Sequence, residues 1–142
     1  MNTLAPVSEI MTSDLITVNP EDKLEQVQEI FNKHRIHHVP VVRYKEIVGM
    51  ISKSDVLYFL RGLTNNSYEK VLNDVRLKNY TAKDIMTKGI AKLSSKDRIA
   101  VALEIFKENL FHAIPVVDDG ELVGILTTYD IIKKLTERKT NT

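Results

Sequence analysis

Apolar residues recur at intervals of three and four positions in two separate stretches of the chain, over 24–31 and over 99–106. Each stretch predicts an amphipathic helix of about three turns. A short apolar run precedes each helix, at 15–18 and at 90–93, and polar turn formers close it. We interpret these runs as short strands or extended segments.

Each predicted helix is followed by two runs rich in β-branched residues, which indicate a pair of neighbouring strands. The four runs span 36–42, 47–51, 111–117 and 122–126. A second helix then begins at Ser52 or Thr127 and is expected to turn an apolar pair towards the core, Val56-Leu57 or Ile131-Ile132. The order β-α-β-β-α in each half predicts an α+β fold.

The two halves are copies of one unit. An offset of 75 positions aligns residues 7–57 with 82–132 without a gap, and 15 of the 51 pairs are identical. Unrelated segments of ordinary composition would agree at about one position in sixteen, so the match indicates an internal repeat.

We expect the first repeat to cover 1–63 and the second to cover 82–136. Between them, 64–81 is predicted to be a helical connector, and 137–142 a frayed tail. Apolar residues at helical spacing form the predicted face of the connector helix: Tyr68, Val71, Leu72 and Val75.

Composition and charge narrow the classes of function. Twenty basic residues oppose nineteen acidic ones, so no bulk charge points to nucleic acid or to an anionic membrane. Cysteine is absent, which removes disulfides, thiolate nucleophiles and thiolate metal sites. No signal peptide and no apolar stretch of about 20 residues is recognisable. We therefore expect a cytoplasmic globular protein that binds neither nucleic acid nor membrane.

Two short motifs occur in each repeat, in register. The first, apolar-polar-x-apolar-Pro, spans 36–40 and 111–115, and the second, Gly-apolar-apolar-Ser/Thr-x-x-Asp, spans 49–55 and 124–130. With the β-α-β-β-α order, the chain resembles a stand-alone tandem pair of cystathionine-β-synthase (CBS) domains, a Bateman module. The resemblance implies two repeats packed through their sheets with pseudo-two-fold symmetry, and adenosyl ligands bound between those sheets.

The Ser/Thr-x-x-Asp segment supports two interpretations. Ser52 and Thr127 stand at predicted helix N-caps, where unpaired N–H groups and the helix dipole suit a phosphate. From spacing alone, the favoured role of Asp55 and Asp130 is a capping box with those residues. The family resemblance implies instead that each Asp accepts hydrogen bonds from both ribose hydroxyls, which suits a carboxylate because it only accepts.

The glycine that opens this motif, Gly49 or Gly124, stands where a strand runs into a helix. A missing side chain there lets either a ligand or another part of the chain come close.

Three histidines precede the paired prolines: His37 and His38 in the first repeat, and His112 beside Ala113 in the second. Lone histidines are usually surface or strand residues, but the resemblance implies contact with phosphate oxygens. Protonated histidine binds anions better than neutral histidine, so we expect stronger nucleotide binding at mildly acidic pH. We expect two unequal sites and at most one tight site, which contains the first repeat's histidines.

The resemblance also implies an apolar pocket for adenine, at positions that alone would be taken as core. Its candidates are Ile16 and Ala91, with Met11 and Met86 just upstream. The remaining nucleotide-binding candidates lie within the two motifs: Ile36, Phe111, Lys53 and Thr128.

No metal site or catalytic constellation is expected. His34, His37 and His38 lie at a spacing that does not bring three nitrogens to one point. The repeated Asp has no acid or base partner within its copy, and neither a Gly-x-Ser-x-Gly elbow nor a Gly-x-x-x-x-Gly-Lys loop occurs.

We therefore predict a regulatory module, not an enzyme, that senses AMP, ADP, ATP or another adenosyl compound and changes the packing of its halves or of two chains. The expected partners are a second copy, forming a homodimer, and an unidentified effector protein. Amphipathic helices could supply the dimer surface, through Leu24, Val27, Leu57, Leu103 and Ile132. Two alternatives stay open: a ligand-free structural or interaction module whose motifs only cap helices, and a different ligand, such as S-adenosylmethionine, a guanine nucleotide or a diadenosine nucleotide.

Overall fold

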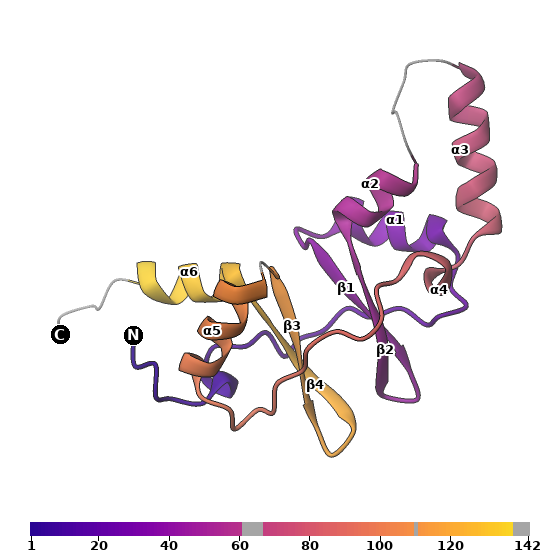
Figure 1. The fold of residues 1–142 in the computed structure, drawn as a ribbon. Coiled ribbons are helices and arrows are strands. Elements are labelled where there is room, and N and C mark those ends of the chain that lie inside the picture. Colours follow the sequence, from indigo (N-terminus) through magenta and orange to yellow (C-terminus); the bar gives the residue numbers. More distant parts are fainter. Residues whose placement is uncertain (61–66, 110, 138–142) are drawn as a thin grey trace. The chain divides into compact units, whose positions relative to one another are not determined.

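The chain folds into two compact units, seen in a computed structural model that describes residues 1–60, 67–109 and 111–137 (Figure 1). The first-repeat unit consists of Ile16–Ile90. The second-repeat unit combines Met1–Leu15 with Ala91–Thr142. The opening residues of each repeat therefore fold with the body of the other repeat.

The first-repeat unit is built on an antiparallel hairpin. Its elements in chain order are α1 (Leu24–Lys33), β1 (His38–Arg43), β2 (Glu46–Ser52), α2 (Lys53–Phe59), α3 (Ser67–Asn79) and α4 (Ala82–Ile85). Tyr44 and Lys45 connect the strands with φ angles of 50° and 69°, as a two-residue type I′ turn requires. Val18 adds a parallel bridge to Val41. The apolar run at 15–18 is thus an extended segment with one bridging residue.

An apolar cluster fills this unit. Because α1 presents apolar residues every three or four positions, Leu24 and Val27 are fully buried in the same cluster as Val39 of the hairpin. Val56 of α2 joins the cluster, whereas Leu57 is 46% exposed, so the prediction that both turn to the core is right only for Val56. Fully burying one such aliphatic side chain contributes roughly 1.5–3 kcal/mol.

The second-repeat unit repeats this plan. Its elements are the 3₁₀-helix η1 (Val7–Glu9), α5 (Ile99–Asn109), β3 (Ala113–Asp118), β4 (Glu121–Thr127) and α6 (Thr128–Thr136). Leu93 makes the parallel bridge to Val116, and the strands pair in the same register as in the first hairpin. In α6, Ile131 is buried and Ile132 is 57% exposed, so here too only one residue of the pair turns inward.

The opening segment of each repeat, which folds with the other repeat, is attached there by equivalent backbone hydrogen bonds. The N–H of Ala82 donates to the carbonyl of Asp22 at 2.8 Å in the first-repeat unit. Its counterpart Val7 donates to Asp97 at 2.7 Å in the second-repeat unit. Neither α4 nor η1, which these bonds anchor, is predicted by the apolar pattern, because each is only a single turn.

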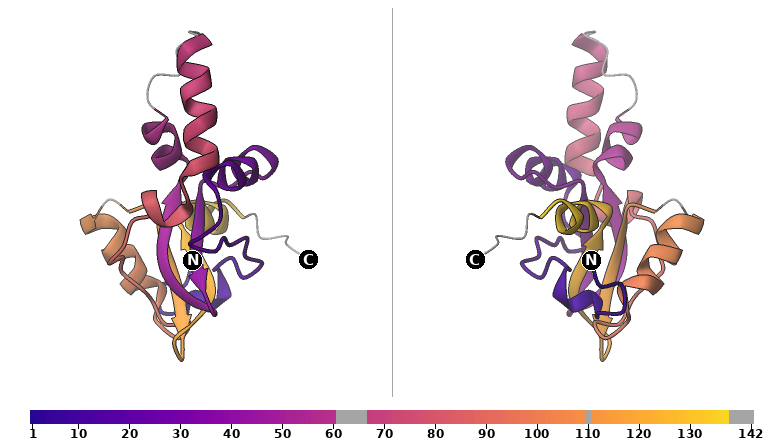
Figure 2. Two further views of the ribbon diagram at one scale, coloured as in Figure 1. Left: turned by 90° about the vertical axis from the view of Figure 1, so that its right-hand side faces the viewer. Right: turned by 90° about the vertical axis from the view of Figure 1, so that its left-hand side faces the viewer.

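Helix α3 lies within the predicted connector, 64–81, and extends away from the hairpin of its own unit (Figures 1 and 2). On the predicted face of this helix, Tyr68, Val71 and Val75 are exposed and Leu72 is half-buried, whereas Leu77 is buried in the core cluster. The first residues of the predicted connector, 64–66, lie outside the described residues, as does the predicted frayed tail beyond residue 137.

Candidate functional site

The two sequence motifs meet at the end of each hairpin where the second helix begins. In the first-repeat unit, His38 lies opposite Ser52 across β1 and β2, and the N–H of Lys53 donates to the carbonyl of His37 at 2.8 Å. In the second, Thr128 donates to His112 at 3.0 Å. Strand pairing thus gathers the candidate polar residues of each repeat in one place.

Both Ser/Thr-x-x-Asp segments form capping boxes. In the first-repeat unit, Oδ2 of Asp55 accepts the N–H of Ser52 at 2.8 Å, and Oγ of Ser52 accepts the N–H of Asp55 at 3.0 Å. Asp130 and Thr127 make the same pair of bonds at 2.8 and 3.1 Å. The capping interpretation is therefore confirmed, and each carboxylate is oriented by the cap through its Oδ2 atom.

The second oxygens of the two carboxylates differ. Oγ1 of Thr12 donates a hydrogen bond of 2.9 Å to Oδ1 of Asp130 within the second-repeat unit. The equivalent residue in the first-repeat unit is Thr87, and among the described residues neither it nor any other donates to Oδ1 of Asp55. The two repeats thus offer unequal acceptors, and Asp55 has the freer one.

Gly49 and Gly124, which stand at equivalent positions of the two repeats, each pack against a methionine. A Cβ atom placed on Gly49 would lie 2.5 Å from Sδ of Met86, and one on Gly124 would lie 2.5 Å from Sδ of Met11. Both glycines have ordinary backbone φ angles, so space is the reason for glycine here. Of the two possibilities that the sequence leaves open, close approach of another part of the chain is the one observed.

A pocket of about 440 Å³ lies beside Asp55 in the first-repeat unit, lined by Asp55, Tyr58, Phe59, Arg76 and Ile85. It combines one carboxylate, one guanidinium and the aromatic side of α2. The sequence pattern does not identify Arg76 or the two aromatic residues, because their approach to Asp55 depends on how α2, α3 and α4 pack. Ile85 carried a signal in the sequence, since Ile85-Met86-Thr87 repeats Ile10-Met11-Thr12 at the offset of 75 positions.

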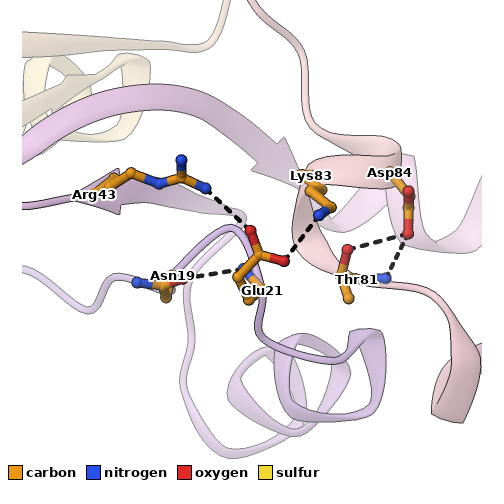
Figure 3. A network of polar contacts seen from close by, with 6 residues as sticks. All are labelled: Asn19, Glu21, Arg43, Thr81, Lys83 and Asp84. Carbon is orange, nitrogen blue, oxygen red and sulfur yellow. Dashed lines mark hydrogen bonds and ion pairs between the residues drawn. The ribbon is translucent and has the colours of Figure 1, made fainter.

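An ion-pair network holds α4 close to the loop before α1 (Figure 3). Glu21 accepts from Lys83 of α4 at 2.8 Å and from Arg43 of β1 at 3.0 Å. These two cations, Lys83 first, lower the pKa of Glu21 below its usual value. The network anchors α4, which directly precedes Met86 and Thr87, to the loop before α1.

The equivalent positions in the second-repeat unit carry the opposite charges, with Lys96 in place of Glu21 and Asp118 in place of Arg43. Asp118 accepts the N–H of Ser95 at 2.9 Å and the hydroxyl of Ser94 at 3.3 Å. Hydrogen bonds from these serines hold the pKa of Asp118 below its usual range. The electrostatic surroundings of the two repeats therefore differ.

The other predicted site residues lie on these two units in varied environments. His37, His112, Phe111 and Lys53 are exposed, whereas His38, Ile36, Ile16, Ala91 and Thr128 are half-buried. Ile36 packs against the core cluster of its unit. No histidine is among the described residues that line the pocket beside Asp55.

The described ranges contain neither a cluster of metal-binding side chains nor a helix that could span a membrane. No group of three or more His, Asp or Glu side chains is placed there to hold a metal ion. Of the helices in the same ranges, none combines the length and the apolar character needed to cross a membrane.

The sequence matches one family model in both repeats and several curated proteins over most of its length. The CBS domain family model matches residues 7–62 and 82–137. Inosine-5'-monophosphate dehydrogenase of Methanocaldococcus jannaschii is 30% identical over 128 residues, which make up 89% of this chain and 23% of that protein. The chain spans less than half the length of the first curated relatives that it matches.

Solved structures share the fold. The CBS domain of a CBS domain-containing membrane protein from Sphaerobacter thermophilus matches with a TM-score of 0.80 and 28% identity, covering 92% of this chain and 88% of that one. CBSX2, a CBS-pair protein from Arabidopsis thaliana, was solved in complex with AMP. That complex matches with a TM-score of 0.75 and 25% identity over 92% of this chain and 96% of that chain.

Proposed function

The chain belongs to the CBS-domain family as a tandem pair of α+β repeats, and on that premise we propose that it is a regulatory module that binds adenine nucleotides. We place its principal site in the first-repeat unit, at Asp55. The match to CBSX2, solved with AMP and similar over nearly the whole of both chains, supports this class of ligand.

One observation carries the proposal: the Asp55 carboxylate is oriented by the cap and lines a pocket with one oxygen still available. The bond from Ser52 fixes Oδ2, and no described residue donates to Oδ1. A ribose offers two neighbouring hydroxyl donors, which a carboxylate can accept without presenting a competing donor. The pocket, at about 440 Å³, is within the 300–1,000 Å³ typical of small-molecule sites.

Asp130 is a weaker candidate for the same role. Both of its oxygens already accept hydrogen bonds, one from the backbone of Thr127 and one from the hydroxyl of Thr12. A ribose at this position would have to share or displace the Thr12 bond, which costs part of the binding free energy. We therefore propose two sites of unequal affinity.

The rival function is a ligand-free structural or interaction module, and the two complete capping boxes favour it. Its motifs would then serve only to begin α2 and α6. Capping and ligation can be separated, because Ser52→Ala removes a cap acceptor and keeps the Asp55 carboxylate. Asp55→Asn keeps a cap acceptor and loses an oxygen that accepts from ribose.

A thermal-shift panel of adenosine, AMP, ADP and ATP tests the proposal. A ligand at about 100 times its Kd should stabilise the wild type by roughly 2.7 kcal/mol. Ser52→Ala should lower the unliganded stability by about 1 kcal/mol and keep the ligand shift. Asp55→Asn should keep the unliganded stability close to that of the wild type and lose the ligand shift. Silence of the wild type across the panel, or an unchanged shift in Asp55→Asn, would favour the ligand-free module.

Regulation, not catalysis, is the proposed output, expressed through a second copy or an effector protein. For a homodimer surface, Leu24 and Val27 must be withdrawn from the residues predicted, because both are fully buried in the core of their own unit. Leu57 and Ile132 are exposed and stay as candidates. Light scattering of the wild type and of Leu57→Asp and Ile132→Asp would test this: the wild type should have the mass of two chains, and a monomeric wild type would contradict the dimer.

A further inference from the structure

We propose that Arg76, on the connector helix α3, binds the phosphate of the nucleotide whose ribose is held by Asp55. The inference rests on the proposed function and deepens it, because it names the group that lets the site prefer a nucleotide over the nucleoside. The histidines of the first motif are the sequence-based candidates for that role, and Arg76 is a different residue from a different element.

The geometry around Arg76 is that of a held but unpaired cation. The guanidinium lines the same pocket as Asp55, and the residue is half-buried. Its Nη1 donates to Oδ1 of Asn73 at 3.2 Å, one turn earlier on α3. Within the described part of the chain, no carboxylate forms an ion pair with it, in contrast to Arg43, which is paired with Glu21.

Packing keeps α3 in place beside the pocket. The ring of Phe59, which lines the pocket from α2, meets Tyr80, just after α3, edge to face with centroids 5.0 Å apart. Tyr80 in turn donates its N–H to the carbonyl of Arg76 at 3.0 Å, and its own carbonyl accepts from Leu24 of α1. The Arg76 backbone is thus linked through Tyr80 to α1 and α2, and its guanidinium donates to Asn73 on the same helix.

The chemistry of the two charged groups selects the ligand. The Asp55 carboxylate, which only accepts hydrogen bonds, and the Arg76 guanidinium, which only donates them, line the same pocket and carry opposite charges. They do not form an ion pair with each other. A ligand that matches both must bring hydroxyl donors to one group and an anion to the other. The planar guanidinium binds phosphate oxygens through two parallel N–H donors, which a histidine or a lysine cannot reproduce. A nucleotide meets both requirements, whereas a nucleoside meets only the first.

Isothermal titration with adenosine and with AMP tests the inference on the full chain. Arg76→Gln should weaken AMP binding about tenfold or more and leave adenosine binding within about twofold, because only AMP carries the phosphate. Arg76→Lys, which keeps the charge but loses the fork, should give an intermediate loss and covers the case in which Arg76→Gln is poorly folded. Lys78→Gln removes an exposed cation from the same helix and should bind AMP like the wild type.

The outcomes separate this inference from the proposed function. If the wild type binds neither adenosine nor AMP, the proposed function is wrong, and the role of Arg76 that rests on it is wrong as well. If the wild type binds both, but Arg76→Gln and Arg76→Lys bind AMP as tightly as the wild type, only the role of Arg76 is overturned. An equal loss for AMP and adenosine would also overturn it, because it would mean that Arg76 shapes the pocket and does not bind the phosphate.

Discussion

Replacing Gly49 by alanine should disturb the packing of the segment that carries Met86 and Thr87 against β2 of the first-repeat unit. The added Cβ would lie 2.5 Å from Sδ, 2.7 Å from Cγ and 3.0 Å from Cβ of Met86. Rotation about the side-chain bonds of Met86 can move its sulfur and Cγ, but its Cβ is fixed to the backbone. Relief of the clash therefore requires the paired backbone of Met50 and Thr87 to move.

Gly124→Ala is the matched control, because its new Cβ meets only atoms that can rotate away. The contacts are Sδ at 2.5 Å, and Cε and Cγ at 3.1 Å, of Met11. Overpacking typically costs about 1–3 kcal/mol, so we expect about 3 kcal/mol for Gly49→Ala and about 1 kcal/mol for Gly124→Ala. The lower entropy of alanine in the unfolded chain offsets roughly 0.4–1 kcal/mol of each cost.

Urea unfolding followed by circular dichroism would measure both costs. Met86→Ala in the Gly49→Ala background should recover part of the lost stability, because it removes the two closest atoms and leaves the Cβ contact. A Gly49→Ala variant as stable as the wild type, or a larger cost for Gly124→Ala, would refute the reasoning.

Further predictions concern the hairpin turn, the ion-pair network and the histidines. Lys45→Gly should raise stability by about 1 kcal/mol, because Lys45 holds a φ of 69° whereas the equivalent position already has Gly120; a loss in urea unfolding would contradict it. The lowered pKa of Glu21 contributes stability at pH values above the unfolded carboxyl pKa, and that contribution is lost as the pH falls through the lowered folded pKa. Glu21→Gln should therefore melt below the wild type at neutral pH and together with it in acid, and a gap that persists in acid would show another cause. His37→Ala and His38→Ala should each weaken AMP binding if these histidines contact the phosphate; unchanged AMP affinity in both variants, measured by isothermal titration, would exclude that contact.

The regular elements were predictable because their apolar spacing reflects burial in the core. The helix over 24–31 and the strand runs after it appear close to their expected bounds, since a period of 3.6 or 2 is imposed by one buried face. The single-turn elements α4 and η1 were not predictable in the same way. Their stability depends on backbone hydrogen bonds to the loop of another repeat, and no local periodicity encodes such bonds.

The candidate site was predictable where its geometry is local. Ser52 and Asp55 lie three residues apart, and that spacing fixes the capping box. Arg76 was not predictable, because its position beside Asp55 depends on the packing of α2, α3 and α4. The difference between Asp55 and Asp130 was not predictable either. Both repeats have a threonine at the equivalent position, Thr12 or Thr87, and only Thr12 donates to the repeated Asp among the described residues.

Isothermal titration of AMP into the wild type, Asp55→Asn and Asp130→Asn tests the central claim most directly, because it ranks the two repeated carboxylates as ligands in one assay. Losing a hydrogen bond to a charged group costs about 1.5–3 kcal/mol, which corresponds to a loss of roughly tenfold to a hundredfold in affinity. The account predicts that loss for the tight site in Asp55→Asn, with Asp130→Asn binding AMP at that site like the wild type. Wild-type affinity in Asp55→Asn, or no AMP binding by the wild type at all, would contradict it.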